Sequence, residues 1–254
     1  MPATVAKAID VLKVVANEHD GVTVSQIAVR LKMTHASVSR MIKTLRDEGV
    51  IRRDEASGRL YPGLRLWALG APAVKQLSFR RVALPAIASA LGIMGRSANL
   101  GVAQDDSVLY LETLDLVGNY VTSVPAGLEM PYHATTMGKA ILAFQSPAFI
   151  EAVIGRGLQR YTPQTITNGD DLKRELAGIR DYGFALNRGE YRETGLAAAV
   201  PLLSLTGVAV AAISVPASQD EVDPDSDLVK TLVRLGHSIS LQLGYGEALS
   251  DHAL

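Results

Sequence analysis

Polar and cationic side chains recur along one stretch of the chain at spacings that a helix would place on a single face. His35, Ser37 and Arg40 come first, Lys43 follows within one turn, and no acidic residue intervenes before Asp47. Such hydroxyl, imidazole and guanidinium groups hydrogen-bond base edges in the major groove of DNA, and a lysine ammonium contacts phosphate. The chemistry that this pattern indicates is recognition of double-stranded DNA.

Two short helices must hold these side chains in place. Thr23 and Gln26 lie three residues apart, which is the spacing of a capping box, and the Thr34 hydroxyl can cap a second helix. The second helix has one apolar face at i, i+3, i+4, i+7 spacing, so its polar face stays exposed. The apolar residues are Val38, Met41, Ile42 and Leu45. The alternative is that the polar residues are only the solvated face of an amphipathic helix.

A basic hairpin follows the two helices. Residues 54–58 read as its loop, because Gly58 can adopt a positive φ, and arginines flank the loop on both sides. Two helices and a hairpin in this order are typical of a winged helix-turn-helix, whose second helix enters the major groove. The predicted DNA-contacting residues are Thr34, His35, Ser37, Ser39, Arg40, Lys43, Arg52, Arg53 and Arg59.

The charge distribution favours DNA as the partner of this segment. The whole chain has a formal net charge of −1, which by itself indicates no nucleic acid. Residues 1–68, however, hold 11 Lys and Arg against 7 Asp and Glu, whereas the remainder holds 14 against 19. The basic excess therefore lies with the helix-turn-helix pattern, as binding to phosphate requires.

The length of the chain points to two domains and a linker. A DNA-binding module needs far fewer than 254 residues. We predict a winged helix-turn-helix domain over residues 1–68, a linker helix over 69–79 and a second domain over 80–254. A DNA reader usually needs a second copy for two half-sites, so we expect a dimer through the linker region, although a helix packed on its own domain is the alternative.

The second domain mixes helical and strand periodicities. Its strand-like segments are grouped toward both ends, with helices between and after them, which predicts an α+β domain with a mainly antiparallel sheet. A small ligand fits between such a sheet and its helices. The predicted strands are 98–103, 107–114, 120–124, 184–186, 197–203 and 208–215, and the predicted helices are 82–94, 137–144, 147–154, 170–182 and 226–243.

Several classes of site are not expected. The chain has no cysteine, and its five histidines show no ligand spacing, so we expect no metal site and no cofactor. No segment has the pattern of a signal peptide or a membrane span, so we expect a cytoplasmic protein. His133 and Lys139 have no nucleophile and orienting acid at a recognisable spacing, so we predict no catalytic residues and interpret His133 as a turn-fixing or capping residue.

Three separated segments resemble the IclR-type transcriptional regulators. MTHASVSRMIKTL (33–45) is similar to the recognition helix of that family, and PYHATTMGKAILA (131–143) to its strongest effector-domain motif. The third segment runs from Tyr182 to Ser214. The resemblance covers essentially the whole chain and implies a winged helix-turn-helix, a linker helix and a GAF-like effector domain. It also implies a dimer through the DNA-binding end, which often pairs again into a tetramer.

The resemblance also implies an effector site beside the helix that opens at Thr136. Free N–H groups at a helix start suit a carboxylate, so an organic acid is the expected effector. Tyr191 departs from an acidic pair in the family pattern, and Ala197 and Pro216 replace polar residues, which indicates fewer hydrogen-bonding groups on one wall of the pocket. The positions matching the family's effector site are Asn119, Thr122, Met130, Thr136, Met137, Asn187, Ala197 and Ser214.

We therefore expect a transcriptional regulator whose binding to operator DNA is modulated by a small metabolite. Two alternatives belong to other classes. An enzyme could act on the small molecule and use the N-terminal domain only for recruitment. An architectural module could use the helix-turn-helix only to dimerise, in which case it would show no salt-dependent affinity for DNA.

Overall fold

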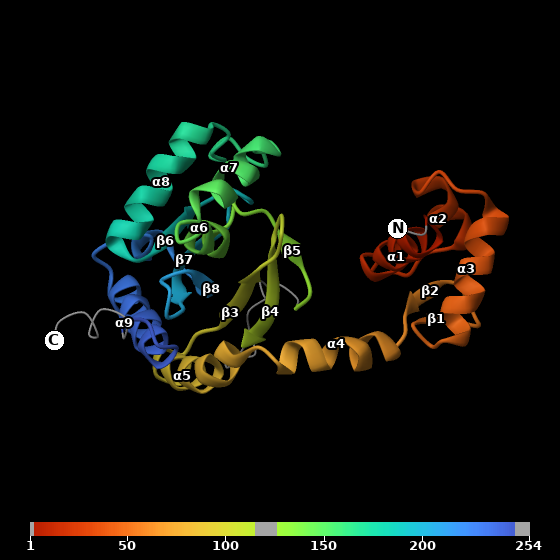
Figure 1. The fold of residues 1–254 in the computed structure, drawn as a ribbon, viewed down its shortest axis with the longest axis horizontal. Helices are drawn as coiled ribbons and strands as arrows, with labels where there is room; N and C mark the ends of the chain where they lie inside the picture. The colour runs from red at the N-terminus through yellow and green to blue at the C-terminus, as the bar shows by residue number, and fades with distance from the viewer. Residues whose placement is uncertain (1–2, 115–125, 247–254) are drawn as a thin grey trace. The chain divides into compact units, whose positions relative to one another are not determined.

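The computed structural model describes residues 3–114 and 126–246. The chain divides into two units, Met1–Leu77 and Ser78–Leu254, each with its own internal packing (Figure 1). Each unit is described by itself.

The first unit is the predicted winged helix-turn-helix. Its helices are α1 (Ala3–Ala16), α2 (Val24–Arg30) and α3 (His35–Asp47), and its wing pairs β1 (Ile51–Arg53) with β2 (Leu60–Pro62). The capping box of Thr23 and Gln26 is present, and the Thr34 hydroxyl accepts the Ser37 N–H at 3.3 Å. The core that joins the helices to the wing contains Val11, Val15, Ile27, Val38, Ile42 and Leu60.

The linker helix α4 lies over Arg65–Lys75 rather than over the predicted residues 69–79. The helix begins three residues after the last wing strand, which ends at Pro62. It ends at Lys75, before α5 starts at Ser78. None of its residues is buried, and Leu64, Trp67 and Leu69 are 89%, 72% and 66% exposed. The helix therefore presents apolar side chains that nothing in its own unit covers.

The second unit is built on a six-stranded antiparallel sheet. The strand order is β5-β4-β3-β8-β7-β6. The strands are β3 (Ala98–Ala103), β4 (Val108–Leu114), β5 (Glu129–Met130), β6 (Ala185–Arg188), β7 (Leu196–Leu203) and β8 (Ala209–Pro216). The turn at 205–207 closes the β7–β8 hairpin as predicted, with Ser204 N–H bonded to Val208 O at 2.9 Å. Strand β5 was not predicted, and the predicted strand 120–124 lies outside the described residues.

Helices cover both faces of this sheet. The short helix α6 (Thr136–Leu142) lies on one face, where Met137 packs beside Gly101 of β3. On the other face α9 (Asp227–Gln242) approaches β7 so closely that a Cβ on Gly236 would lie 2.9 Å from the Val200 side chain. The remaining helices are α5 (Ser78–Met94), which starts four residues before the predicted 82, α7 (Pro147–Gly155), α8 (Gly169–Tyr182) and the 3-10 turn η1 (Gln219–Glu221).

No single helix in the described ranges is long and apolar enough to cross a bilayer. Helices α4 and α5 reach that length only when they are counted together across the break between them.

Candidate nucleic-acid interface and effector site

The outer face of α3 carries cationic side chains that are not bonded to other described residues. Arg40 and Lys43 are exposed, and neither forms a side-chain hydrogen bond or ion pair with another described residue. His35 is also exposed, and its Nδ1 lies 3.3 Å from the Ser39 hydroxyl. Ser37 is half-buried, with its N–H satisfied by Thr34. The helix thus presents free donors to a partner, which is the arrangement that base and phosphate contacts need.

The three wing arginines differ in the contacts that their guanidinium groups make within the unit. The Arg52 guanidinium lies 4.5 Å from the centre of the Tyr61 ring, and Arg53 Nε donates to Gly58 O at 3.3 Å within the wing. Arg59 Nη1 instead donates to Gly21 O at 2.8 Å, which ties the wing to the loop before α2. Arg59 therefore has a structural role, which sequence reasoning missed because its partner is 38 residues away.

The wing loop is held in shape by a carboxylate. Asp54 Oδ1 accepts hydrogen bonds from the Ser57 N–H at 2.7 Å and from the Ser57 hydroxyl at 2.6 Å. These bonds to Ser57 hold the pKa of Asp54 below its usual value. The loop can therefore present Arg52 and Arg53 in a fixed arrangement.

In the second unit the start of α6 is tightly built. The Thr135 hydroxyl accepts the Gly138 N–H at 3.2 Å and donates to Pro131 O at 2.8 Å. A Cβ on Gly138 would lie only 2.3 Å from Tyr132 O, so this position requires glycine. Thr136 and Met137 follow the cap, and both are buried.

Three of the predicted effector contacts have partners within the protein. Asn187 Oδ1 accepts the N–H groups of Gly189 and Glu190 at 2.8 and 2.9 Å, and its Nδ2 donates to Ala134 O at 3.3 Å. Met130 and Met137 are both in the hydrophobic core. The structure gives these three side chains internal roles, and their contact with a ligand stays a prediction.

Other predicted positions lie along the sheet on the face that α6 covers. Asn99 of β3 pairs with Ser214 of β8, which in turn pairs with Ala199 of β7. Ser214 is 4% exposed, and its hydroxyl forms no hydrogen bond with another described residue. In the next row Ala197 pairs with Pro216. Asn119 and Thr122 lie outside the described residues.

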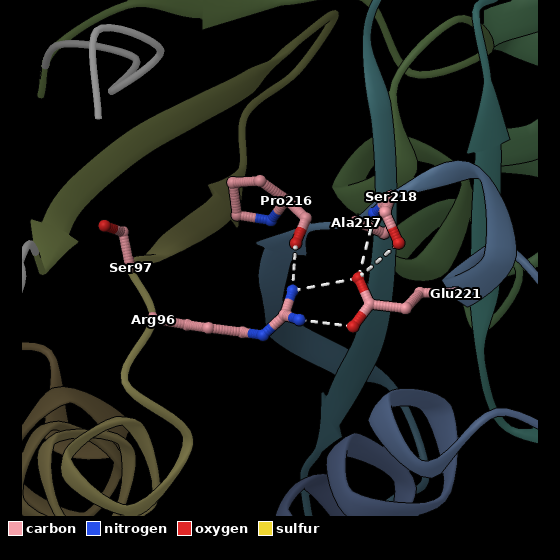
Figure 2. Close-up of a pocket in the computed structure, with 6 residues that line it drawn as sticks. All are labelled: Arg96, Ser97, Pro216, Ala217, Ser218 and Glu221. Atoms are coloured by element: carbon pink, nitrogen blue, oxygen red, sulfur yellow. Dashed lines mark hydrogen bonds and ion pairs between the residues drawn. The ribbon is translucent and has the colours of Figure 1, made fainter. Parts of the chain in front are cut away.

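A cavity of about 280 Å³ opens at this end of the sheet (Figure 2). Pro216 lies opposite Ala197 and two residues beyond Ser214, but none of the predicted effector positions is among the described residues that line the cavity. Sequence reasoning did not single out the two charged residues in its lining, although the Ser218–Glu221 spacing is a readable capping box. The lining residues are Arg96, Ser97, Pro216, Ala217, Ser218 and Glu221.

A buried lysine connects α6 to the surrounding elements. Lys139 is 0% exposed, and its Nζ donates to Glu175 at 2.7 Å, Leu186 O at 2.9 Å and Glu190 at 2.5 Å. Burial raises the pKa of Glu190, although Lys139 opposes this shift, and Glu190 Oε2 has no hydrogen-bond partner. All three Nζ donors are used by two carboxylates and a carbonyl, so we interpret the arrangement as a structural network.

His133 fixes a loop rather than capping a helix. Its Nε2 lies 2.9 Å from Gln159 O, and Thr135 is the residue that caps α6. Burial lowers the pKa of His133, and the hydrogen bond to Gln159 O places a proton on Nε2, because a carbonyl oxygen can only accept. Among the residues that the structure describes, no three His, Asp or Glu side chains are grouped so that they could hold a metal ion.

Comparison with known proteins assigns both units. Residues 4–55 match the family model described as the IclR helix-turn-helix domain, and residues 71–241 match the model for the bacterial transcriptional regulator IclR C-terminal domain. The chain is also similar to the HTH-type transcriptional regulator BhcR from Paracoccus denitrificans (strain Pd 1222). The two are 30% identical over 210 residues, which cover 82% of this chain and 75% of that protein.

Two solved structures extend the similarity to the fold. The IclR transcriptional regulator from Alicyclobacillus acidocaldarius matches with a TM-score of 0.81 at 26% identity, over 96% of this chain and 100% of that one. An IclR homolog from Microbacterium hydrocarbonoxydans, complexed with 4-hydroxybenzoate, matches with a TM-score of 0.78 at 25% identity, over 94% and 98%.

These matches confirm the predicted regulator and do not support the enzyme alternative. The relatives are named as transcriptional regulators or repressors, and a homologue holds a small-molecule ligand. The fold also agrees with the predicted α+β class. The chain belongs to the IclR family of bacterial transcriptional regulators.

Proposed function

We propose that α3 enters the major groove of an operator and that a small carboxylate bound in the second unit changes operator affinity. The observation that carries the DNA part is the exposed face of α3, where Arg40 and Lys43 have no partner among the described residues. His35 and Ser39 lie beside Arg40 on this face and are proposed to contact base edges. On the wing, Arg52 and Arg53 are proposed to contact phosphate, whereas Arg59 contributes by holding the wing in place.

The proposal of a carboxylate rests on the ligand of a relative and on the polarity of the site. The homolog from Microbacterium hydrocarbonoxydans is complexed with 4-hydroxybenzoate, which carries a carboxylate. In this chain the buried Ser214 lies two residues before Pro216, which lines the cavity. Of the positions that match the family's site, Ser214 and Ala197 are therefore the first to test, followed by Thr136.

We further propose that the regulator works as a homodimer in the cytoplasm. The exposed Leu64, Trp67 and Leu69 give α4 an apolar surface suited to a second copy of the chain. A dimer would present two reading helices to two half-sites of an operator. Light scattering on the full chain tests this, and a monomer at micromolar concentration would contradict it.

The test is binding of the full chain to the DNA upstream of its own gene. Fluorescence anisotropy at low and high salt, with and without 4-hydroxybenzoate, measures operator affinity and its response to an acid. We expect affinity that falls steeply with salt, because cationic contacts release counterions from phosphate. Self-association without salt-dependent DNA binding would instead support the architectural module.

A further inference from the structure

One ion pair lines the cavity and ties two separate segments of the second unit together. Arg96 lies two residues after the end of α5, and Glu221 ends η1. The Arg96 guanidinium binds both oxygens of the Glu221 carboxylate: Nη1 donates to Oε2 at 3.1 Å, and Nη2 donates to Oε1. Nη1 also donates to Pro216 O at 3.2 Å, so the cation rests at the end of β8 (Figure 2).

Glu221 has a second set of donors that does not depend on Arg96. Its Oε2 accepts the Ser218 N–H at 2.9 Å and the Ser218 hydroxyl at 3.0 Å. The hydrogen bond from Ser218 is the largest influence that lowers the pKa of Glu221, and Arg96 adds to it. Ser218 and Arg96 share Oε2, so Ser218 can still stabilise the Glu221 carboxylate if a ligand takes its place on the guanidinium.

The pair also faces solvent on the cavity side. The Arg96 and Glu221 side chains are 33% and 25% exposed, so both charged groups can be reached from the cavity. Among the described residues that line the cavity, Arg96 is the one cationic side chain. An anion that enters the cavity therefore competes with Glu221 for this guanidinium.

We propose that Arg96 binds the carboxylate of the effector and that the ligand does so by replacing Glu221 on the guanidinium. This inference rests on the proposed function and specifies its site. A planar carboxylate matches the two Nη donors that Glu221 now occupies, so the ligand can form the same two hydrogen bonds, while Ser218 remains as a donor to Glu221. A ligand of this class is a small monocarboxylate whose body fits a cavity of about 280 Å³.

The exchange would also act on the helix that leads to the DNA reader. Helix α5 is held by one arginine near each end, Arg80 to Glu112 at 2.7 Å and Arg96 to Glu221. Only the second pair lines the cavity. Replacing Glu221 releases η1 from the end of α5, while the start of α5 continues through residues 76–77 into α4. A ligand that favours the released state shifts the population toward it.

The test compares three variants of the full chain in calorimetric titrations. The probes are benzoate, 4-hydroxybenzoate and propionate, each beside its uncharged amide. Arg96→Gln should weaken the acids about 10- to 100-fold, because a hydrogen bond to a charged group is lost. Glu221→Gln should tighten the same acids about 2- to 5-fold, because the competing carboxylate is gone. Glu112→Gln breaks the other α5 ion pair and should leave acid affinity unchanged. The amides should respond to none of the three.

The acid affinities of Arg96→Gln and Glu221→Gln should change in opposite directions, and this difference tests the proposal. If Glu221→Gln weakens the acids as Arg96→Gln does, the pair is only structural and the proposal is overturned. Unchanged acid affinity in Arg96→Gln also overturns the proposal. If Arg96→Gln does not fold, Arg96→Lys takes its place, because lysine keeps the charge but not the two-pronged geometry. Failure of every acid to bind the wild type would remove the carboxylate assignment.

DNA binding separates this proposal from the proposed function. If the acids change operator affinity equally in the wild type and in Arg96→Gln, the effector-controlled regulator stands and the Arg96 site fails. If the wild type shows no salt-dependent DNA binding, the proposed function itself fails.

Discussion

Helix α3 and helix α6 both carry motif residues that resemble those of known regulators, yet the two helices use their polar side chains in opposite ways. On α3 the cations Arg40 and Lys43 are exposed, and their side chains form no hydrogen bond or ion pair with another described residue. On α6 the cation Lys139 is fully buried and bonds to two carboxylates and a carbonyl. A cation in a motif can therefore serve a partner or the fold, and burial distinguishes the two.

The difference has an energetic cause. An exposed cation is solvated by water and can exchange that water for phosphate. A buried cation has lost its hydration and must keep every internal partner, because an unpaired charge in the interior is costly. Substitutions on α6 should therefore appear as lost stability, and substitutions on α3 as lost DNA affinity with stability unchanged.

The largest expected effect is on Lys139. Lys139→Ala should lower the free energy of unfolding by about 3–5 kcal/mol, because it leaves the buried Glu190 carboxylate without its cation. Denaturant unfolding of the second unit measures this. Lys173→Ala removes a lysine of the exposed pair with Glu151 and should cost less than about 1 kcal/mol. Equal losses in the two variants would mean that burial does not separate their roles.

The next effect concerns the glycine that precedes Lys139. Gly138→Ala should destabilise the unit by about 1–3 kcal/mol or more, because the added Cβ would lie 2.3 Å from Tyr132 O and 2.5 Å from the Thr135 hydroxyl. Gly155→Ala is the matched variant, since a Cβ there meets nothing within 4 Å. It should be neutral or slightly stabilising within a helix. Thermal unfolding of both variants makes the comparison.

On α3 the removal of a cationic side chain should weaken DNA binding and leave the free energy of unfolding unchanged. Arg40→Ala should weaken operator binding by about 1–3 kcal/mol and relax specificity at one position if Arg40 contacts a base, or weaken all sequences alike if it contacts phosphate. Arg174→Ala removes an exposed arginine of α8, which is paired with Asp171, and serves as the control. Unchanged DNA affinity in Arg40→Ala would remove this residue from the interface.

The sequence predicted most of what depends on neighbouring residues. The caps at Thr23 and Thr34 and the hairpin turn at 205–207 involve partners a few positions away, and all three were predicted correctly. The Asx-type bonds of Asn187 to Gly189 and Glu190 are equally local, and their Asn-x-Gly-Glu spacing was overlooked as a signal.

What could not be predicted depends on chain segments far apart. Glu175 and Glu190 are 36 and 51 residues from Lys139, and Glu221 is 125 residues from Arg96. Periodicity and local spacing contain no information about such pairings, which arise only when the sheet brings the segments together. The motif around Lys139 was therefore identified without its partners, and the cavity at Arg96 was not anticipated.

The smallest expected effect comes from His133, because burial lowers its pKa below the ordinary value of 6.5. As pH falls below about 6.5, the unfolded chain binds a proton that the folded chain does not, so stability decreases by up to about 1.4 kcal/mol per pH unit until the folded pKa is reached. The raised pKa of Glu190 has the opposite effect: as pH falls toward 4.5, the folded chain binds a proton at Glu190 before the unfolded chain does, and stability increases. Both proteins contain Glu190, so the difference between wild type and His133→Gln isolates the histidine. Unfolding free energies measured from pH 7 downward should fall less steeply in His133→Gln, which keeps a donor for Gln159 O but does not titrate. Identical slopes in the two proteins would show that His133 stays accessible to protonation in the folded state.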